Sequence, residues 1–314
     1  MEPLENRSLL NFWMPRYWFT WLVYGWMRAM VFLPFGWQLK LGRLLGRAMH
    51  VALYPRRRVA AANLAACFPD LGESELVALR KKHFESIGMS VNEMSMAWYG
   101  SKEKVRSLIH IEGEENLRAA LDKGKGVILF CAHFTTFEFF FPALEQICPH
   151  VSAMYRAQNN EMMNVIMTRG RRRAIDKLFH KDSVREMVRS LSENSAVWYA
   201  ADQSYRRKYG ALVPFFGVPA WTNTATSRLA RASGATVLPY FCHRLPDDSG
   251  YMLNIAPSLP DLPSDDLVAD TTRLMAALED YVRQCPEQYC WIHKRFKDLP
   301  DPYADFYGPQ KQST

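Results

Sequence analysis

A histidine and a carboxylate stand close together at the end of an apolar run. Residues 127–132 are apolar, His133 follows them directly, and Glu138 comes five positions later. Five residues along one helix would not align the two side chains, but a new helix beginning at Thr135 or Thr136 would hold Glu138 in its first turn, close to the imidazole. A carboxylate bonded to one ring nitrogen leaves the other as a general base toward a substrate hydroxyl. The pair predicts hydroxyl activation without a covalent enzyme intermediate.

The spacing of His133 and Glu138 is not specific by itself. A histidine that is hydrogen-bonded within a core or a loop is the commoner explanation, and the same spacing occurs by chance in many chains. Two further polar residues strengthen the catalytic interpretation, because Arg156 and Asp202 each follow a later apolar run. Ligands of α/β proteins bind outside the carboxyl ends of the strands. We therefore expect His133, Arg156 and Asp202 at one edge of a sheet, with Arg156 as a candidate donor to an oxyanion.

Helices are expected first along the chain and a sheet afterwards. From residue 59 to about residue 100 the apolar spacing is helical, with Ser74 as an N-cap. Beyond Gly113, short apolar runs alternate with helical patterns. The expected strands are 127–132, 151–155, 196–201, 235–242 and 251–255, and the expected helices are 160–179, one beginning at Asp182, 222–234 and 265–283. This alternation predicts the α/β class.

The N-terminal part is the most apolar segment of the chain. Within residues 17–37 the only charged residue is Arg28. The apolar segment is long enough to cross a bilayer, whereas Pro34 and the Trp and Tyr clusters fit equally well a helix lying in the membrane interface. A core helix of a soluble protein is the third explanation. Basic residues gather on its C-terminal side, which predicts a cytoplasmic main body. We divide the chain into a membrane-anchoring or interfacial helix, 1–40, and a catalytic domain, 41–314.

The composition indicates a partner that is both anionic and apolar. The 314 residues carry a net charge of +7, and 13% of them are aromatic. A phosphorylated lipid surface and nucleic acid both fit this balance. The chain contains no glycine-rich phosphate loop and no nucleic-acid-binding motif, so we expect no nucleic acid partner. We expect no metal either, because His133, Glu138 and Asp202 lack a second histidine ligand at helical spacing.

Two other stretches could bind anions. The apolar turn 213–221 would deliver Thr222 to the start of a helix, where a phosphate can bind, although a plain loop and N-cap explain the same residues. Residues 169–173 include four arginines, Arg171 among them. A solvated helix face is the usual explanation of such a run, but the run also suits an acidic carrier protein or a phosphorylated sugar.

Several separated blocks together resemble one family of membrane enzymes, and the resemblance covers nearly the whole chain. The blocks are Pro15-Arg16-Tyr17-Trp18, Asn63-Leu64 with Cys67-Phe68-Pro69, the motif from His133 to Glu138, Tyr155-Arg156, Val197-Trp198-Tyr199-Ala200 with Asp202, Phe215-Phe216-Gly217, and residues 286–297. They resemble the late acyltransferases of lipid A biosynthesis, in particular the lauroyl-transferase branch. Chance agreement over so many blocks is implausible.

The resemblance implies both a fold and a reaction. The fold would be like that of glycerol-phosphate acyltransferases, with a mixed sheet flanked by helices. An acyl-carrier-protein thioester would be the donor, with no further cofactor. A phosphorylated, Kdo-bearing lipid A precursor would be the acceptor, at the cytoplasmic face of the inner membrane. Other acceptors, such as a glycerophospholipid, an ornithine lipid or a glycolipid, stay open, as does a non-enzymatic protein that binds anionic lipid.

The resemblance also implies roles for individual residues. His133 matches the general base of the family and Glu138 its acidic partner, while Arg156, Arg171 and Asp202 fall on positions expected to line the site. Two residues depart from the pattern. Pro142 is expected to kink the helix after Glu138, and Gln203 stands where a basic or aromatic residue is expected.

Overall fold

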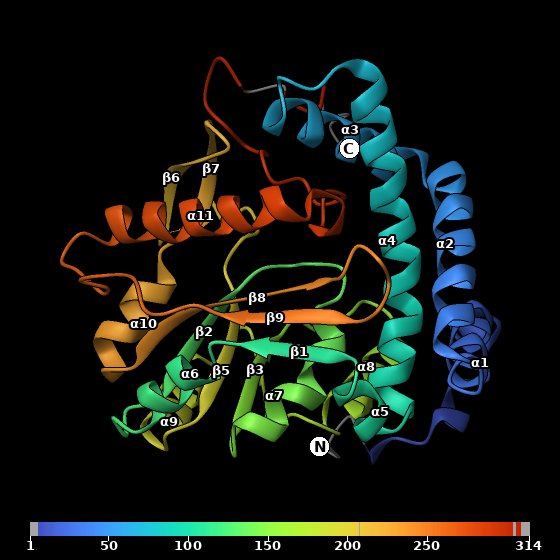
Figure 1. Ribbon diagram of the computed structural model, residues 1–314, viewed down its shortest axis with the longest axis horizontal. Coiled ribbons are helices and arrows are strands. Elements are labelled where there is room, and N and C mark those ends of the chain that lie inside the picture. Colours follow the sequence, from blue (N-terminus) through green and yellow to red (C-terminus); the bar gives the residue numbers. More distant parts are fainter. Residues whose placement is uncertain (1–5, 207, 304–305, 309–314) are drawn as a thin grey trace.

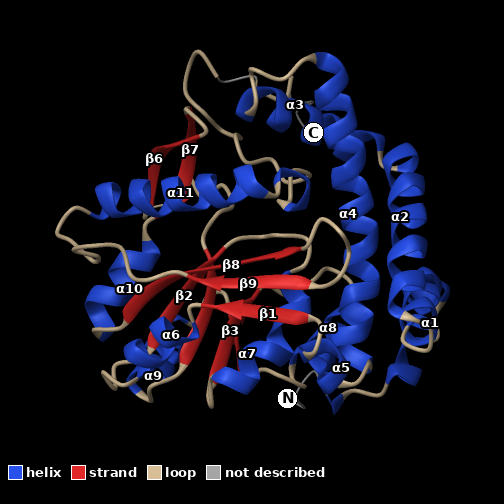
Figure 2. Ribbon diagram, in the orientation of Figure 1, coloured by secondary structure: helices blue, strands red, loops and turns tan. Residues whose placement is uncertain are grey.

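A sheet of parallel and antiparallel strands forms the centre of the molecule. The computed structural model describes residues 6–206, 208–303 and 306–308. Within them, seven strands form one sheet in the order β1 (Ile109–Glu112), β9 (Tyr251–Ile255), β8 (Thr236–Arg244), β2 (Val127–Cys131), β5 (Ala196–Ala200), β3 (Val151–Tyr155) and β4 (Lys177–His180) (Figure 2). Strands β8, β2, β5, β3 and β4 are parallel, and β9 and β1 run in the opposite direction. The predicted α/β class with a mixed sheet flanked by helices is confirmed.

The five expected strands are all present, whereas two edge strands were not expected. β2 is buried along its whole length, which is why it reads as a continuous apolar run. β1 and β4 are short, and they keep exposed or half-buried residues among their members. Such edge strands carry too few apolar residues to stand out in the sequence.

Helices surround the sheet, and two of them differ from the expectation. The flanking helices are α5 (Lys102–Arg106), α6 (Glu114–Leu121), α7 (Phe141–Ile147), α8 (Glu161–Arg171), α9 (Val184–Ser192), α10 (Ala225–Ser233) and α11 (Leu267–Gln284). The helix predicted over 160–179 ends at Arg171, and β4 occupies its last residues. The helix predicted to begin at Thr222 begins at Ala225 instead.

Thr222 belongs to a hairpin outside the main sheet. β6 (Gly210–Phe215) and β7 (Val218–Asn223) pair antiparallel. The two residues that join them, Phe216 and Gly217, both have positive φ angles, 52° and 73°, as a tight hairpin turn of two residues requires. The apolar turn predicted over 213–221 is therefore a strand pair.

Among the described residues, four helices come before α5 and the sheet: α1 (Trp18–Met30), α2 (Phe35–Ala52), α3 (Tyr54–Cys67) and α4 (Glu73–Tyr99). Two short 3-10 helices, η2 (Leu9–Phe12) and η3 (Pro15–Tyr17), come before α1. The helical expectation over 59–100 is met by α3 and α4, but α4 is capped by Gly72 and not by Ser74. In the described part of the chain, no helix combines the length and the apolar character that a membrane crossing needs.

The predicted N-terminal membrane helix is divided into two. Its apolar residues are shared between α1 and α2, and Pro34 separates these helices as the N-cap of α2. The boundary predicted at residue 40 falls inside α2. Positions 1–5 and 309–314 of the two predicted domains lie outside the described residues.

Three glycines let α2 and α4 pack backbone to backbone along one side of the molecule (Figure 1). A Cβ atom on Gly42 would stand 2.6 Å from the Cα atom of Met89, and one on Gly88 would overlap the backbone of Gly42 and Gly46. Real Cβ atoms do not approach so closely, so the crossing tolerates only glycine. The long helix α4 is thereby fixed where several of its side chains reach the loops at the sheet edge.

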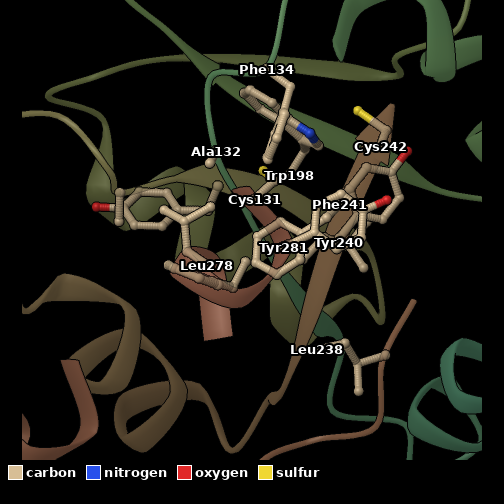
Figure 3. Close-up of a cluster of buried hydrophobic side chains, with 14 of the residues drawn as sticks. Cys131, Ala132, Phe134, Trp198, Leu238, Tyr240, Phe241, Cys242, Leu278 and Tyr281 are labelled. Atoms are coloured by element: carbon tan, nitrogen blue, oxygen red, sulfur yellow. The ribbon is translucent and has the colours of Figure 1, made fainter. Parts of the chain in front are cut away.

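Phe134 anchors the end of β2 in the core. Its ring lies 6.2 Å from the ring of Phe241 and 5.6 Å from that of Tyr281. Figure 3 shows these rings with Trp198 and Cys242 in one cluster of buried side chains drawn from several elements. Because Phe134 is buried, the residue before it in the chain has little freedom to move.

Replacement of Gly88 by alanine tests the α2–α4 crossing. We expect Gly88→Ala to lower the free energy of unfolding by about 1–3 kcal/mol, because the helices must separate to admit a methyl group. Gly25→Ala is the matched control, since a Cβ atom on Gly25 meets nothing within 4 Å, and it should raise helix stability by about 0.5–1 kcal/mol. Chemical denaturation measures both changes. Equal stability of the two variants would contradict the packing argument.

Candidate active site

His133 and Asp202 meet at the carboxyl edge of the sheet. In the parallel pair β2 and β5, Cys131 is aligned with Ala200, and the two polar residues each follow two positions later. Nδ1 of His133 lies 2.6 Å from Oδ1 of Asp202, and the backbone N–H of His133 donates to Oδ2 at 3.0 Å. The His133 side chain is 27% exposed and that of Asp202 only 2%. The imidazole is thus held in one orientation, which leaves Nε2 for a substrate.

The electrostatics of this pair favour an imidazolium. Burial alone lowers the pKa of His133, but the Asp202 charge and hydrogen bond outweigh it and raise the pKa above its usual value. Burial likewise opposes ionisation of Asp202, yet His133 holds the pKa of that carboxyl down at about 2. Asp202 therefore stays ionised at neutral pH and stabilises the charge that a general base acquires when it takes a proton.

Glu138 has a different partner from the one that the sequence predicted. Its Oε1 atom accepts a hydrogen bond from Nε of Arg171 at 2.8 Å and a second from Nη2 of the same residue. Its Oε2 atom accepts from the indole of Trp98 at 3.3 Å. The short 3-10 helix η4 (Phe137–Phe140) buries Glu138, and a buried carboxylate needs a cation to compensate its desolvation. Asp202 thus takes the place at Nδ1 of His133 that was predicted for Glu138.

Pro142 does not kink a helix after Glu138. It stands in the first turn of α7, where proline is well tolerated because the first N–H groups of a helix have no partner within it. The proline therefore starts a helix and leaves the position of Glu138 unaffected.

Phe137 forms an apolar wall between the two pairs. Its ring lies edge-on to that of His133 at 6.1 Å and stacks on Trp198 at 5.1 Å. The Arg171 guanidinium carbon lies 5.9 Å from the centre of the Phe137 ring. The charge of Arg171 reaches His133 across this wall and opposes the protonation that Asp202 favours.

Residues 286–296 complete the site from the far end of the sequence. The Thr135 amide donates to the carbonyl of Gln288 at 2.8 Å, and the Cys290 amide donates to the carbonyl of His133 at 3.0 Å. These bonds bring the ring of His293 to 6.0 Å from that of His133. Loss of solvation, and then the charge of His133, lower the pKa of His293. A second imidazole that favours its neutral form therefore stands beside the first.

Sequence reasoning did not single out His293. It stands between the apolar pair Trp291-Ile292 and the basic pair Lys294-Arg295, and the polar side chain after an apolar run was the only local signal. Its distance in sequence from His133 hid the contact, because only the folded chain brings the two loops together.

A buried ion pair is linked to residues 286–296. Arg244 of β8 donates through Nε to Oε1 of Glu93 at 2.8 Å, and both side chains are almost fully buried. The backbone of Arg244 exchanges two hydrogen bonds with the Gln288 side chain, at 2.7 and 2.9 Å. The contacts join α4 and the sheet to residues 286–296.

Two other predicted residues, Arg156 and Thr222, make no hydrogen bond to His133 in the described part of the chain. Arg156 follows β3 at the predicted edge, and its side chain is exposed. Thr222 is completely buried in β7, donates to the Ala220 carbonyl at 3.1 Å and accepts from Arg295 at 2.6 Å. The prediction that Thr222 binds an anion at a helix start is therefore wrong, because its hydroxyl is committed within the core.

The arginine run at 169–173 is turned largely inward. Arg169 donates to the Arg7 carbonyl at 2.8 Å, and Arg173 donates to that of Gly100 at 3.0 Å. Arg171 is committed to Glu138. These contacts fasten α8 to the N-terminal segment and to the end of α4, so the run is not the solvated face that its composition indicates.

The whole chain resembles one family of bacterial enzymes. A family model for the bacterial lipid A biosynthesis acyltransferases matches residues 7–298. The palmitoleoyltransferase of lipid A biosynthesis from Escherichia coli is 35% identical over 93% of this chain and 95% of its own length. The chain belongs to the bacterial lipid A biosynthesis acyltransferase family. Acyl transfer in lipid A biosynthesis is therefore its class of activity, as the sequence motifs predicted.

Other members of the family differ in how much they share with the chain. The E. coli lauroyltransferase of lipid A biosynthesis is 33% identical over 97% of this chain and 99% of its own length. The E. coli myristoyltransferase of lipid A biosynthesis is 26% identical over 90% of this chain and 88% of its own length. Of these three relatives, the myristoyltransferase shares the lowest sequence identity with the chain.

The geometry suits general-base chemistry. Such chemistry requires a base with a free ring nitrogen and a group that stabilises the protonated base. Nε2 of His133 and the carboxylate of Asp202 are placed for these two tasks. Glu138 and Arg171 lie behind Phe137, where they hold η4 and α8 together.

Titration of His133 separates the contributions of the two carboxylates. We expect Asp202→Asn to lower the pKa of His133, because the change removes the anion that favours the imidazolium. Glu138→Gln should change the pKa of His133 less, because Glu138 acts on His133 indirectly. Loss of the Glu138 carboxylate leaves the charge of Arg171 uncompensated, and that charge opposes protonation of His133. NMR titration of the histidine ring protons, assigned with His133→Ala, measures both effects. A larger pKa shift of His133 in Glu138→Gln than in Asp202→Asn would show that Glu138, and not Asp202, is the main partner of His133.

Proposed function

We propose that this chain transfers a medium-chain, lauroyl-type fatty acyl group from acyl-carrier protein to a hydroxyl on an acyl chain of a lipid A precursor. The acceptor is phosphorylated and bears Kdo, the product enters lipopolysaccharide, and the reaction needs no metal or other cofactor. The observation that carries the proposal is the His133–Asp202 pair, with Nδ1 bonded to the carboxylate at 2.6 Å in a member of this family.

The proposed reaction is a direct transfer. Nε2 of His133 removes the proton from the acceptor hydroxyl as the oxygen attacks the thioester carbonyl carbon. A tetrahedral oxyanion forms and collapses with cleavage of the carbon–sulfur bond, and the imidazolium returns its proton to the leaving thiolate. Asp202 stabilises the imidazolium throughout. Arg156, which is exposed after β3, is the proposed donor to the oxyanion.

Glu138 acts in this proposal as a positioning residue. Its pairing with Arg171 and Trp98 fixes η4, and η4 carries the Phe137 ring that packs against His133. Loss of Glu138 should therefore reduce turnover by loosening the wall of the site and by freeing the charge of Arg171.

The main test is mass spectrometry of a lipid A precursor incubated with the enzyme and a panel of acyl-carrier-protein thioesters. Wild type should add one acyl mass, and the best donor names the preferred chain length. His133→Ala should lose about 10²- to 10⁴-fold in turnover, while His110→Ala, an exposed histidine of β1, should keep the wild-type rate. Full activity of His133→Ala would refute the catalytic assignment, and no product with any donor would refute the acceptor.

We also propose that the chain attaches to the cytoplasmic face of the inner membrane through α1 and α2. Large apolar side chains stay exposed on these helices, among them Phe19 at 76%, Leu22 at 72% and Phe32, which follows α1, at 83%. Exposed apolar area of this extent marks a membrane or protein interface. Trp18, Trp26 and Trp37 accompany them, and tryptophan favours the depth of the lipid headgroups.

Binding to vesicles tests this attachment. The double variant Phe19→Ser/Leu22→Ser should bind anionic phospholipid vesicles at least about tenfold more weakly, because each buried side chain of this size contributes roughly 1.5–3 kcal/mol. Val184→Ser/Val268→Ser changes two exposed valines on α9 and α11 and should bind as wild type does. Equal loss in both variants, measured by co-sedimentation, would contradict attachment through α1.

A further inference from the structure

Four basic side chains meet where α2, α3 and α4 come together, a place that we call the basic corner. It consists of His50 at the end of α2, Arg57 at the start of α3, and Arg80 and Lys81 on α4. Nη1 of Arg57 donates to the His50 carbonyl at 3.2 Å, and the His50 ring packs edge-on against Phe84 at 5.1 Å. The corner is thus a fixed part of the helix packing.

Two buried nitrogens of the basic corner have no hydrogen-bond partner among the described residues. They are Nε of Arg80 and Nε2 of His50. Leaving a buried polar group unpaired is unfavourable, and proteins seldom do so without a ligand or a bound water. A solvated basic face would instead keep these nitrogens in water, so the composition alone does not explain them.

The charges around the basic corner repel one another. Burial lowers the pKa of His50, and Arg80, Arg57 and Lys81 lower it further. Burial and then the charge of Arg57 lower the pKa of Arg80 in the same way. Glu85, one turn beyond Lys81 on α4, is bonded to Arg47 at 2.7 Å. An anionic ligand would relieve this repulsion, and arginine side chains suit the geometry of phosphate.

The surroundings of the corner are apolar and exposed. Val51 and Tyr54, which flank it, are 73% and 55% exposed, and Leu44 on the preceding turns of α2 is 61% exposed. Exposed apolar side chains therefore occur on α2 as well as on α1. A ligand bound here would meet positive charge and apolar surface together, which is the chemistry of a phosphorylated lipid.

The basic corner is linked through α4 to the loop of His133. Arg80 and Ser86 are six positions apart on α4, about 9 Å along the helix axis, and Ser86 is hydrogen-bonded to Thr135 at 2.6 Å. Arg56, next to Arg57, donates to the Ile292 carbonyl at 3.3 Å, directly before His293. One extended lipid could therefore contact both places.

We propose that the basic corner binds a phosphate monoester group of the acceptor lipid and thereby places an acceptor acyl chain at His133. The inference rests on the proposed function, because it takes the acceptor to be phosphorylated. A monoester carries up to two negative charges and three acceptor oxygens, enough for several cationic donors at once.

The kinetic test compares Arg57→Gln and Lys81→Gln with Arg118→Gln, an exposed arginine of α6 on another part of the surface. The acceptor is supplied as isolated and after removal of its phosphates by a phosphatase. Each corner variant should raise KM for the phosphorylated acceptor about tenfold or more, with little change in kcat and no change with the dephosphorylated acceptor. Arg118→Gln should match wild type. An equal effect on both acceptors, or none on either, would overturn the proposal.

A binding test separates failure of this inference from failure of the proposed function. Zwitterionic vesicles are doped with the phosphorylated acceptor, the dephosphorylated acceptor or phosphatidylglycerol, and binding is measured without donor. Corner-dependent binding of the phosphorylated acceptor alone supports the site even if no acyl group is transferred. If the corner variants keep the wild-type KM and kcat for the phosphorylated acceptor, the phosphate site is refuted and the proposed function is not affected. Equal corner-dependent binding of phosphatidylglycerol would show a general anionic-lipid surface and overturn the proposal.

Both corner variants change side chains that solvent reaches, so their folding can be checked directly. Thermal unfolding within a few degrees of wild type would show that a raised KM reflects lost binding. Arg57→Lys offers rescue, because it keeps the charge and should recover part of the affinity for the phosphorylated acceptor only.

Discussion

The parallel register of β2 and β5 is the constraint on which the site depends. Cys131 lies opposite Ala200, so two equal steps beyond this pair bring His133 and Asp202 side by side. A shift of one residue in that register would send one of the two side chains to the other face of the sheet. Full burial of β2 and the packing of Phe134 make such a shift costly, because each would expose or displace apolar side chains.

Two buried carboxylates near the site do different work because their neighbours differ. Asp202 has a titratable partner and influences the proton affinity of His133 directly. Glu138 is paired with the guanidinium of Arg171 and accepts a hydrogen bond from an indole N–H. Its contribution is to the shape of the pocket wall. The same side-chain chemistry thus orients an imidazole and raises its pKa in one place and stabilises packing in the other.

Much of the fold could be predicted from apolar runs, and much less of the side-chain pairing. The strands β2, β3, β5, β8 and β9 were recognisable because their buried residues form short apolar runs. The edge placement of His133, Arg156 and Asp202 followed from the ends of these runs. The partner of His133 was not recognisable, because β5 lies between β2 and β3 only in space. The short sequence distance favoured Glu138, but in the 3-10 helix η4 the Glu138 side chain bonds Arg171 instead.

The errors at Thr222 and His293 have different causes. Pro214, Gly217 and Pro219 resemble a loop in sequence, yet positive φ angles at residues 216 and 217 close a hairpin. His293 reaches the site through bonds between distant segments, among them the backbone bonds made by Gln288 and Cys290. The hairpin is local, but its prolines and glycine are typical of a loop, whereas the contact of His293 exists only in the folded chain.

The contribution of residues 286–296 has a consequence for the order in which activity arises during synthesis. Every strand of the sheet precedes these residues in the chain, so a growing polypeptide can pair β2 with β5 while the loop of His133 still lacks the bonds to Gln288 and Cys290. Because residues 286–296 are the last of the site to be synthesised, a chain that ends before them lacks the segment that brings His293 beside His133.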